Sequence, residues 1–184
     1  AITGADKIDA GVIKLFGKEV KIKSPRDSIN AGIAFLPEDR KNQGLILIQT
    51  ILFNTSLVRL DRYTSFSFLK LRSIRQMVEK IASELRLRAT NVNSVVGELS
   101  GGNQQKVVIA KWLLTKAKVF IFDEPTRGID VGAKVEVYNL INELIAKGAA
   151  VIIICSEMDE VIGMADRILT MHEGRITAEF SQEE

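Results

Sequence analysis

The first part of the chain contains short segments in which apolar and polar positions alternate. Residues 12–16 are mostly apolar and residues 19–22 alternate, and Gly17–Lys18 stands between them, which predicts a β-hairpin that turns at this pair. Ser24 followed by proline then predicts the start of a short helix, because serine caps free backbone amides and proline fits the first helical position. Gly32 predicts the end of that helix.

Further along, the pattern changes from the strand period to the helix period. The apolar run 33–36 predicts a buried strand, and residues 37–44 predict a charged loop. From about residue 50 to 87, apolar positions recur every three or four residues, which predicts helices. The longest of these helices has one apolar stripe, formed by Leu71, Ile74, Val78, Ile81 and Leu85. Because this helical run interrupts a strand-rich region, we expect a helical subdomain inserted in an α/β core.

The last part of the chain alternates strands with helices. Apolar runs predict strands at 118–123 and 149–155, with a helix from about 131 to 147 between them. The segments 167–171 and 175–180 flank a turn sequence and predict a terminal hairpin. Such alternation of strands and helices is typical of a mainly parallel sheet.

These patterns predict the α/β fold class, with a mainly parallel sheet, an N-terminal antiparallel hairpin region and an inserted helical subdomain. The 184 residues suffice for one sizeable core. We expect three parts: a partial β subdomain (1–49), a helical subdomain (50–98) and a core (99–184).

The composition is that of an ordinary globular protein, with 46% hydrophobic and 26% charged residues. Basic residues number 25 against 23 acidic ones, so nucleic-acid binding is not indicated. The single cysteine, Cys155, excludes an internal disulfide, and its place at the end of an apolar run favours a buried structural thiol. No apolar run approaches the ~20 residues of a membrane span. The chain does not begin with methionine, and we expect it to be a piece of a longer protein.

Ser100, Gly101 and Gly102 stand at the predicted start of a helix. A helix start offers free amides and a partial positive charge to a phosphate, and glycine lets the backbone approach a ligand closely. Three such residues could also form no more than a tight turn with a capping serine. The whole segment Leu99–Lys106, followed by a second motif, favours a phosphate site over that simpler interpretation.

The second motif is an apolar strand, 119–122, that ends in Asp123 and Glu124. Ligands of open parallel sheets bind beyond the carboxyl ends of the strands, where these two acids fall. Asp123 is placed to hold Mg²⁺ through water, and Glu124 to orient or deprotonate an attacking water. The alternative is that both acids only cap the following turn.

Together these motifs resemble the ATP-binding subunits of ABC transporters, over nearly the whole chain. Leu99–Gln104 resembles the family's signature motif, 119–124 its Walker B strand, and Gly128–Asp130 its D-loop. Pro37–Lys41, Asn103–Lys106, Asp123–Lys134 and Ser156–Met158 are most similar to the second, C-terminal ATPase half of bacterial importers of ribose, galactose, arabinose or xylose. The resemblance implies a P-loop NTPase core.

In such subunits two halves sandwich ATP with Mg²⁺, and each site joins one half's Walker A loop to the other half's signature. The resemblance therefore implies that Asp123 and Glu124 face the nucleotide of this half and are the catalytic pair. It also implies that the ATP of the partner half is contacted by Ser100, Gly101, Gly102, Asn103, Gln104 and Asp130.

The resemblance further implies partners and a location. A membrane permease would place its coupling helix in a groove framed by residues 50–87 and the loop of Glu38. A periplasmic sugar-binding protein would be an indirect partner, and the first nucleotide-binding half a direct one. The expected location is the cytoplasmic face of the bacterial inner membrane, with peripheral attachment.

Three features depart from the family pattern. The Walker A segment is missing and is expected just upstream of Ala1, so we expect the fragment alone to be inactive. Glu157 stands at the place of the switch histidine, and a carboxylate cannot donate a hydrogen bond to the γ-phosphate and would repel it. Glu38 replaces the Q-loop glutamine and is at most a second contact to Mg²⁺. The single histidine, His172, is expected at the surface of a hairpin tip.

We therefore expect this half's own ATP site to be degenerate, while its signature serves the site opposite. Two alternatives stay open. A non-transport ABC ATPase that acts on DNA or the ribosome would be favoured by long coiled-coil insertions or a basic face, neither of which the sequence contains. A purely non-catalytic half would regulate or complete a partner's site.

Overall fold

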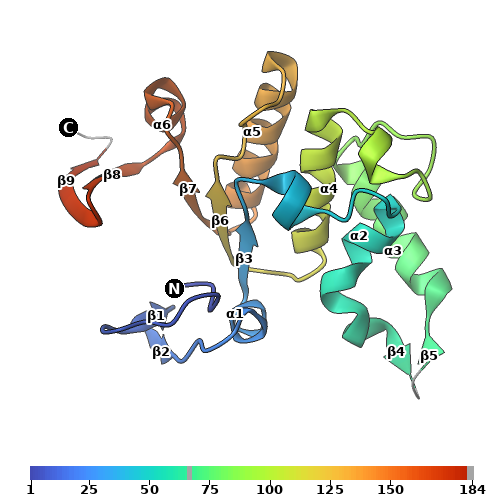
Figure 1. Ribbon diagram of the computed structural model, residues 1–184, viewed down its shortest axis with the longest axis horizontal. Helices are drawn as coiled ribbons and strands as arrows, with labels where there is room; N and C mark the ends of the chain where they lie inside the picture. Colours follow the sequence, from blue (N-terminus) through green and yellow to red (C-terminus); the bar gives the residue numbers. More distant parts are fainter. Residues whose placement is uncertain (66–67, 182–184) are drawn as a thin grey trace.

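The computed structural model describes residues 1–65 and 68–181 (Figure 1). Residues 66–67 of the expected helical subdomain and 182–184 of the expected core lie outside the described residues. The elements in chain order are β1 (Ile13–Leu15), β2 (Lys18–Val20), α1 (Pro25–Ala31), β3 (Ile33–Leu36), the π-helical turn η1 (Arg40–Gly44), α2 (Ile51–Ser56), the 3₁₀ segment η2 (Leu57–Tyr63), β4 (Thr64–Ser65), β5 (Phe68–Leu69), α3 (Leu71–Glu84), the 3₁₀ turn η3 (Val96–Glu98), α4 (Gly101–Leu113), β6 (Val119–Asp123), α5 (Val131–Ala146), β7 (Ala150–Ile154), α6 (Met158–Met164), β8 (Arg167–His172) and β9 (Arg175–Ser181).

A parallel sheet of three strands in the order β3–β6–β7 forms the centre of the described structure. β6 lies in the middle, and its three central residues are buried, as its apolar sequence predicts. The helices α4 and α5 contact each other and pack on β3 and β7, so they cover one face of this sheet (Figure 1). The α/β class and the parallel sheet expected from the alternation of strands and helices are confirmed.

The helical part packs on α4 through the predicted apolar stripe. Four members of that stripe are buried in α3 or at its end: Ile74, Val78, Ile81 and Leu85. The fifth, Leu71, is 67% exposed because it stands in the first turn, beyond the contact with the core. Trp112 is partly buried against the same core cluster, as expected for a packing residue.

The predicted end signals of two helices are confirmed. The Ser24 side chain caps α1 by accepting from the amide of Asp27, and Gly32 closes that helix in the left-handed conformation at φ 89°. Asp130 caps α5 by accepting from the amide of Ala133. Short polar side chains thus set the ends of these elements.

The turn of the first hairpin differs from the expectation by one residue. Leu15 pairs with Lys18, so Phe16 and Gly17 form the two-residue turn in place of Gly17–Lys18. Both turn residues have positive φ values, 51° and 76°, which matches the twist of a tight hairpin. The sequence favours a strand position for Phe16 because it extends an apolar segment, but in the structure it is an exposed turn residue.

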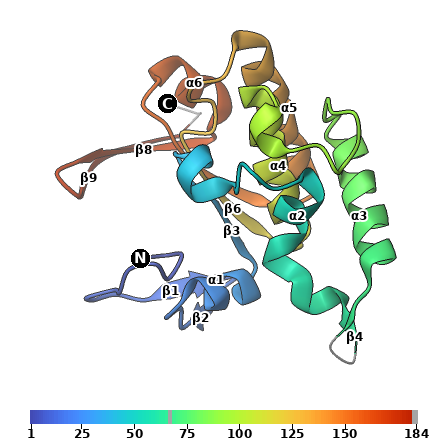
Figure 2. The same cartoon turned by 45° about the vertical axis from the view of Figure 1, so that its right-hand side comes forward.

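Three local elements were not anticipated. The expected charged loop after β3 contains the turn η1, the region expected to be helical contains the short β4–β5 pair, and the helix α6 follows β7. Short elements of this kind carry too few residues for a periodic signal. The hairpins β1–β2 and β8–β9 lie on the side of the sheet away from α2 and α3 in both views (Figures 1 and 2).

The strand β7 is the outer strand of the described sheet, which affects Cys155. Ile152 and Ile154 of this strand are 46% and 49% exposed. Cys155, directly after the strand, is half-buried. The expectation of a buried structural thiol at this position is therefore wrong. Within residues 1–65 and 68–181, none of the helices combines the length and apolar character needed to cross a bilayer.

Candidate functional site

The turn Ser100–Gly102, called the signature turn below, begins α4. Ser100 is extended, and its hydroxyl oxygen accepts from the Asn103 amide at 3.4 Å and from the Asn103 side chain at 2.9 Å. Within the described part of the chain, the amides of Gly101 and Gly102 have no acceptor, as is usual in the first turn of a helix. The turn therefore presents backbone donors and the positive end of a 13-residue helix.

Both glycines are required by the packing of the turn. A Cβ atom at Gly102 would lie 2.5 Å from the Cβ of Ala133 in α5. A Cβ atom at Gly101 would lie 2.8 Å from Nη2 of Arg40 and 3.2 Å from the carbonyl oxygen of Gly128. The sequence suggested that glycine makes room for a ligand, whereas in the structure neighbouring protein atoms occupy this room.

A shallow pocket of about 170 Å³ lies where the first turns of α4 and α5 meet. Ser100, Gly102 and Asn103 line it from α4, and Asp130 from the cap of α5. The structure thus brings together four of the residues predicted to contact ATP. The pocket is completed by Arg88, Gly132, Ala133 and Glu136.

Gln104, also predicted to contact ATP, points into the protein. Its side-chain amide donates to the carbonyl oxygens of Val96 and Leu99 at 3.3 and 3.2 Å. Gln104 is buried, so its observed contacts hold the loop before α4. Its predicted contact with ATP would need a different side-chain orientation.

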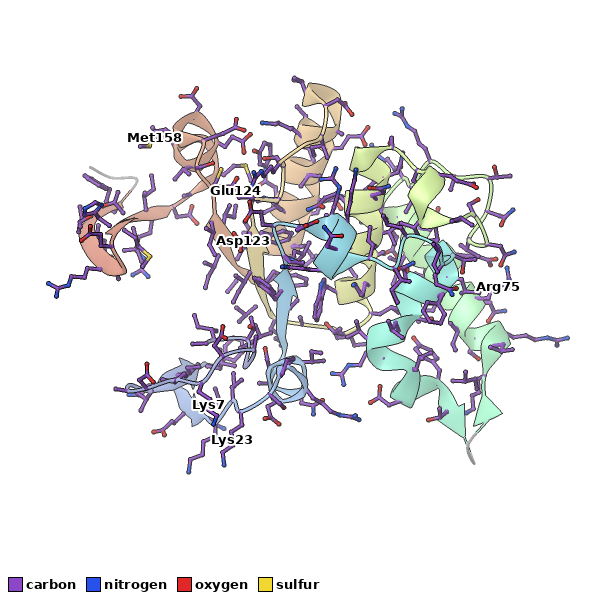
Figure 3. All side chains as sticks on the ribbon, viewed as in Figure 1. Lys7, Lys23, Arg75, Asp123, Glu124 and Met158 are labelled. Carbon is purple, nitrogen blue, oxygen red and sulfur yellow. The ribbon has the colours of Figure 1, made fainter. Side chains whose placement is uncertain are left out.

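Asp123 and Glu124 lie side by side at the end of β6, on the side of the molecule that carries α6 (Figure 3). Burial raises the pKa of Asp123, and the neighbouring charge of Glu124 raises it further. A cation beside Asp123 would reverse this effect by favouring the ionised carboxylate. The carboxylate is therefore suited to a divalent metal ion, which in nucleotide sites takes one or two carboxylates together with phosphates and water.

Glu124 has a strained backbone and a bonded carboxylate. Its φ of 45° is unusual for a residue with a side chain, and its amide donates to the carbonyl oxygen of Ile154 at 2.9 Å. Its Oε1 accepts from the Ser156 amide, also at 2.9 Å. The side chain is thereby directed at the end of β7, and a water molecule would be held by Oε2 or by the second lone pair of Oε1.

Glu157 does not present a free negative charge. Both of its carboxylate oxygens accept from Nζ of Lys134 in α5, at 2.9 and 3.0 Å. Lys134 also pairs with Glu160 of α6 at 2.7 Å. The repulsion of a γ-phosphate expected from Glu157 is thus reduced by a lysine that sequence reasoning did not consider.

The polar network around Glu160 joins α5, α6 and the loop after β6. Glu160 accepts from the buried hydroxyl of Thr126 at 2.7 Å, and the Tyr138 hydroxyl donates to Thr126 at 3.2 Å. Burial opposes the ionisation of Glu160, but hydrogen bonds, led by that from Lys134, outweigh it and lower the pKa to about 2. This network fixes the segment that carries Glu157.

Glu38 follows β3 and forms an ion pair with Arg127, in the loop after β6. Two residues further on, Arg40 donates to the carbonyl oxygens of Arg127 and Gly128 at 2.7 and 2.9 Å. The predicted second contact of Glu38 to Mg²⁺ therefore competes with Arg127. His172 is exposed at the tip of the β8–β9 hairpin, where it was expected.

Sequence reasoning missed Arg40, Arg127 and Lys134, which hold the predicted site residues. All three stand inside the segments that carried the family resemblance, namely 37–41 and 123–134. Their charge was visible, but their partners are 23 or more residues away along the chain. No periodic or local signal identifies such pairs.

Comparison with known proteins places this geometry in a family. The family described as "ABC transporter" matches residues 1–127. The ribose import ATP-binding protein RbsA of Oceanobacillus iheyensis is 48% identical over 184 residues, which is 100% of this chain and 37% of that protein. The xylose import ATP-binding protein XylG of Thermoanaerobacter pseudethanolicus is 50% identical over 95% of this chain and 34% of its own length.

The solved structures agree. MJ1267 in its ADP conformation, an ATP-binding cassette of an ABC transporter, superposes with a TM-score of 0.80 at 30% identity, and covers 100% of this chain and 74% of its own. The chain spans little more than a third of the length of the curated relatives named above. Because the family match covers well over half of the 184 residues, the chain belongs to the ABC transporter family.

Proposed function

We propose that this chain is part of the ATP-driven motor of a bacterial sugar importer, in which the signature turn completes an ATP site held mainly by another cassette half. The observation that carries the proposal is the first turn of α4. Among residues 1–65 and 68–181 its two glycine amides meet no acceptor, and the turn lines a pocket shared with the cap of α5. The ribose and xylose import proteins, 48% and 50% identical, support a sugar as the cargo.

The chemistry of the signature turn fits a phosphate group. Backbone amides at a helix start and the Ser100 hydroxyl are donors, and the helix dipole adds a positive potential. Asn103 accepts from the amide of Arg88 at 2.9 Å, which orients its side chain at the rim of the pocket. In this proposal the turn binds the γ-phosphate of ATP, and Asp130 lies beside it.

We propose a lesser hydrolytic role for the strand ends of this same half. Asp123 would hold Mg²⁺ through water, and Glu124 would orient the attacking water. The bonded carboxylates of Glu124, Glu157 and Glu38 support a site that is slow or degenerate, because their partners inside the chain compete with water, Mg²⁺ and phosphate groups for these carboxylates.

The proposed partners follow from the same role. The first nucleotide-binding half supplies the phosphate loop of that shared site, because the signature turn of this half serves the nucleotide that the other half holds. A membrane permease docks near η1 and α2, at the cytoplasmic face of the bacterial inner membrane. A sugar-binding protein acts through that permease.

The test uses the full-length subunit assembled with its permease, and measures ATP turnover. Ser100→Asp keeps a good helix cap but places a negative charge at the phosphate, so we expect a loss on the order of 100-fold. Ser100→Thr keeps the hydroxyl and is the matched control, with a change below about threefold. Glu124→Gln is expected to cost less than about tenfold if the site of this half is degenerate.

Three results would contradict the proposal. If Ser100→Asp turned over ATP as fast as the wild type, the proposed contact of the signature turn with the phosphate would be contradicted. A hundredfold loss in Glu124→Gln with an unaffected Ser100→Asp would reverse the assignment of the two sites. Robust hydrolysis by the 184-residue chain alone, abolished by Glu124→Gln, would show that no second half is needed.

A further inference from the structure

Arg40 joins two segments that are far apart in the sequence. Its guanidinium group donates through Nη1 to the carbonyl oxygen of Arg127 and through Nη2 to that of Gly128, 87 and 88 residues away. Gly128 is in the left-handed conformation, with φ of 67°, just before the cap residue of α5. Arg40 therefore holds the loop that leads into α5 by its backbone.

The same guanidinium group lies against the signature turn. The position of a Cβ atom at Gly101 is 2.8 Å from Nη2 of Arg40, and 3.2 Å from the carbonyl oxygen of Gly128 to which Nη2 donates. Arg40 is thus wedged between the loop before α5 and the start of α4. We call the contact set of Arg40, Gly101 and the carbonyl groups of Arg127 and Gly128 the Arg40 clamp.

Stability alone is a weak reason for an arginine at this place. Its Nε atom is buried and finds no hydrogen-bond partner among residues 1–65 and 68–181. A buried donor without a partner costs free energy, which offsets part of what the two Nη hydrogen bonds contribute. The arginine is better explained by the geometry that it imposes.

The turn that carries Arg40 is also fixed at its far end. The carbonyl oxygen of Gly44, the last residue of η1, accepts from Nζ of Lys111 in α4. A Cβ atom at Gly44 would lie 3.2 Å from a methyl group of Val108, also in α4. The side chain of Asp39 caps the turn by accepting from the amides of Lys41 and Asn42. η1 is therefore a compact unit attached at both ends to the elements around the signature turn.

We propose that Arg40 is a positioning residue: it fixes the signature turn against the loop before α5, so that displacement of η1 changes the geometry offered to the phosphate. This rests on the proposed function, in which the region after β3 faces the permease. A displacement of η1 would change the positions of Ser100 and Asp130 through the contacts of the Arg40 clamp. Arg40 itself does not touch the nucleotide in this proposal.

The experiment compares Arg40→Ala, Arg40→Lys, Gly101→Ala and the double variant Arg40→Ala/Gly101→Ala in the full-length subunit with its permease. Lys41→Ala, at an exposed neighbour in the same turn, is the matched control. We expect Arg40→Ala to lower ATP turnover about tenfold, because small misplacements of binding groups have effects of this size or larger. Arg40→Lys should lose nearly as much ATP turnover as Arg40→Ala, since an ammonium group does not reproduce the planar guanidinium group that donates to two carbonyl oxygens. Lys41→Ala stays within about twofold.

The double variant separates positioning from a structural role. Gly101→Ala should be harmful beside Arg40, because the new methyl group meets Nη2 at 2.8 Å, and less harmful once Arg40 is alanine, when the nearest atom is the carbonyl oxygen of Gly128 at 3.2 Å. The loss of ATP turnover in the double variant should therefore be smaller, by at least about threefold, than the product of the losses in the two single variants. Multiplying losses, or a turnover of Arg40→Ala within twofold of the wild type, would overturn the proposal.

A second measurement does not depend on ATP hydrolysis. Hydrogen exchange of the bonded amides in the first turns of α4 and α5, those of Asn103, Gln104, Ala133 and Lys134, should become faster in Arg40→Ala and remain unchanged in Lys41→Ala. Unchanged exchange in Arg40→Ala would overturn the clamp even if turnover fell. If Ser100→Asp proves harmless while exchange and coupling behave as expected, the proposed function fails and the clamp stands.

Discussion

The signature turn and the acidic strand ends of this molecule differ in how far their polar groups are bonded within the chain. At the signature turn, two amides at a helix start remain open beside a pocket. At the strand ends, Glu124 is bonded to Ser156, and Glu157 to Lys134. The first region presents backbone donors beside a pocket, whereas the acceptor groups of the second region already have partners inside the chain.

The two regions also differ in what holds them. Close contacts of backbone and small side chains hold the signature turn, where two glycine positions have no space for a methyl group. A network of charged groups holds the strand ends, centred on Lys134 and Glu160. Substitutions should therefore damage the first region through volume and the second through charge.

The largest effect is expected at Gly102. Gly102→Ala places a methyl group 2.5 Å from the Cβ of Ala133 and should destabilise the chain by about 3 kcal/mol, the upper range for overpacking. Urea unfolding followed by the fluorescence of Trp112 measures this change. Adding Ala133→Gly should restore most of the loss. Gly132→Ala is the control, because its methyl group would meet no atom nearer than 3.4 Å.

A smaller effect is expected at Glu160. Glu160→Gln removes the charge that Lys134 and the hydroxyl groups surround, at a cost of about 2 kcal/mol at pH 7. The pKa of Glu160 falls from 4.5 to about 2 on folding, so this stabilisation is present above pH 4.5 and is lost as the pH falls toward 2. The difference between wild type and variant in unfolding experiments should shrink over that window. A difference independent of pH would contradict the charge network.

Lys111 should make stability rise with pH as well, but in an alkaline window. Burial lowers its pKa from 10.5 to about 8, so between these values the unfolded chain binds a proton that the folded chain does not. The stability of the wild type relative to Lys111→Met should therefore rise from pH 8 to 10.5, by ~1.4 kcal/mol for each pH unit of this window. A relative stability that stays flat or falls with pH would show that the lysine is hydrated.

The smallest effect is expected at Ser100. Ser100→Ala removes the cap of α4 and should cost about 1 kcal/mol of stability, while Ser100→Asp should cost only a few tenths. Thermal unfolding distinguishes the two. An aspartate variant as unstable as the alanine variant would mean that loss of folding contributes to its loss of turnover.

Much of the fold was predictable because it rests on periodicity and end signals. The stripe of α3, the apolar run of β6 and the caps at Ser24 and Asp130 are local patterns, and the structure confirms them. The turn at Phe16–Gly17 was misplaced by one residue because an exposed aromatic residue extends the apolar segment before it. The helix α6 is too short, at seven residues, for its pattern to stand out.

The site residues themselves were predictable from their spacing, but their partners were not. Ser100, Gly102, Asn103 and Asp130 do line one pocket. That Gln104 points inward, and that Lys134 holds Glu157, depends on contacts between distant segments. A single sequence carries charge and size at each position but does not state which positions meet.

The close approach of Gly102 to Ala133 has a consequence for how this family of sequences can vary. The two positions share space for one methyl group, and that group now belongs to residue 133. A homologue with alanine at 102 should carry glycine at 133, so the pair should exchange together through evolution. Across many relatives, positions 102 and 133 should therefore covary in size, although neither carries a charge or a reactive group.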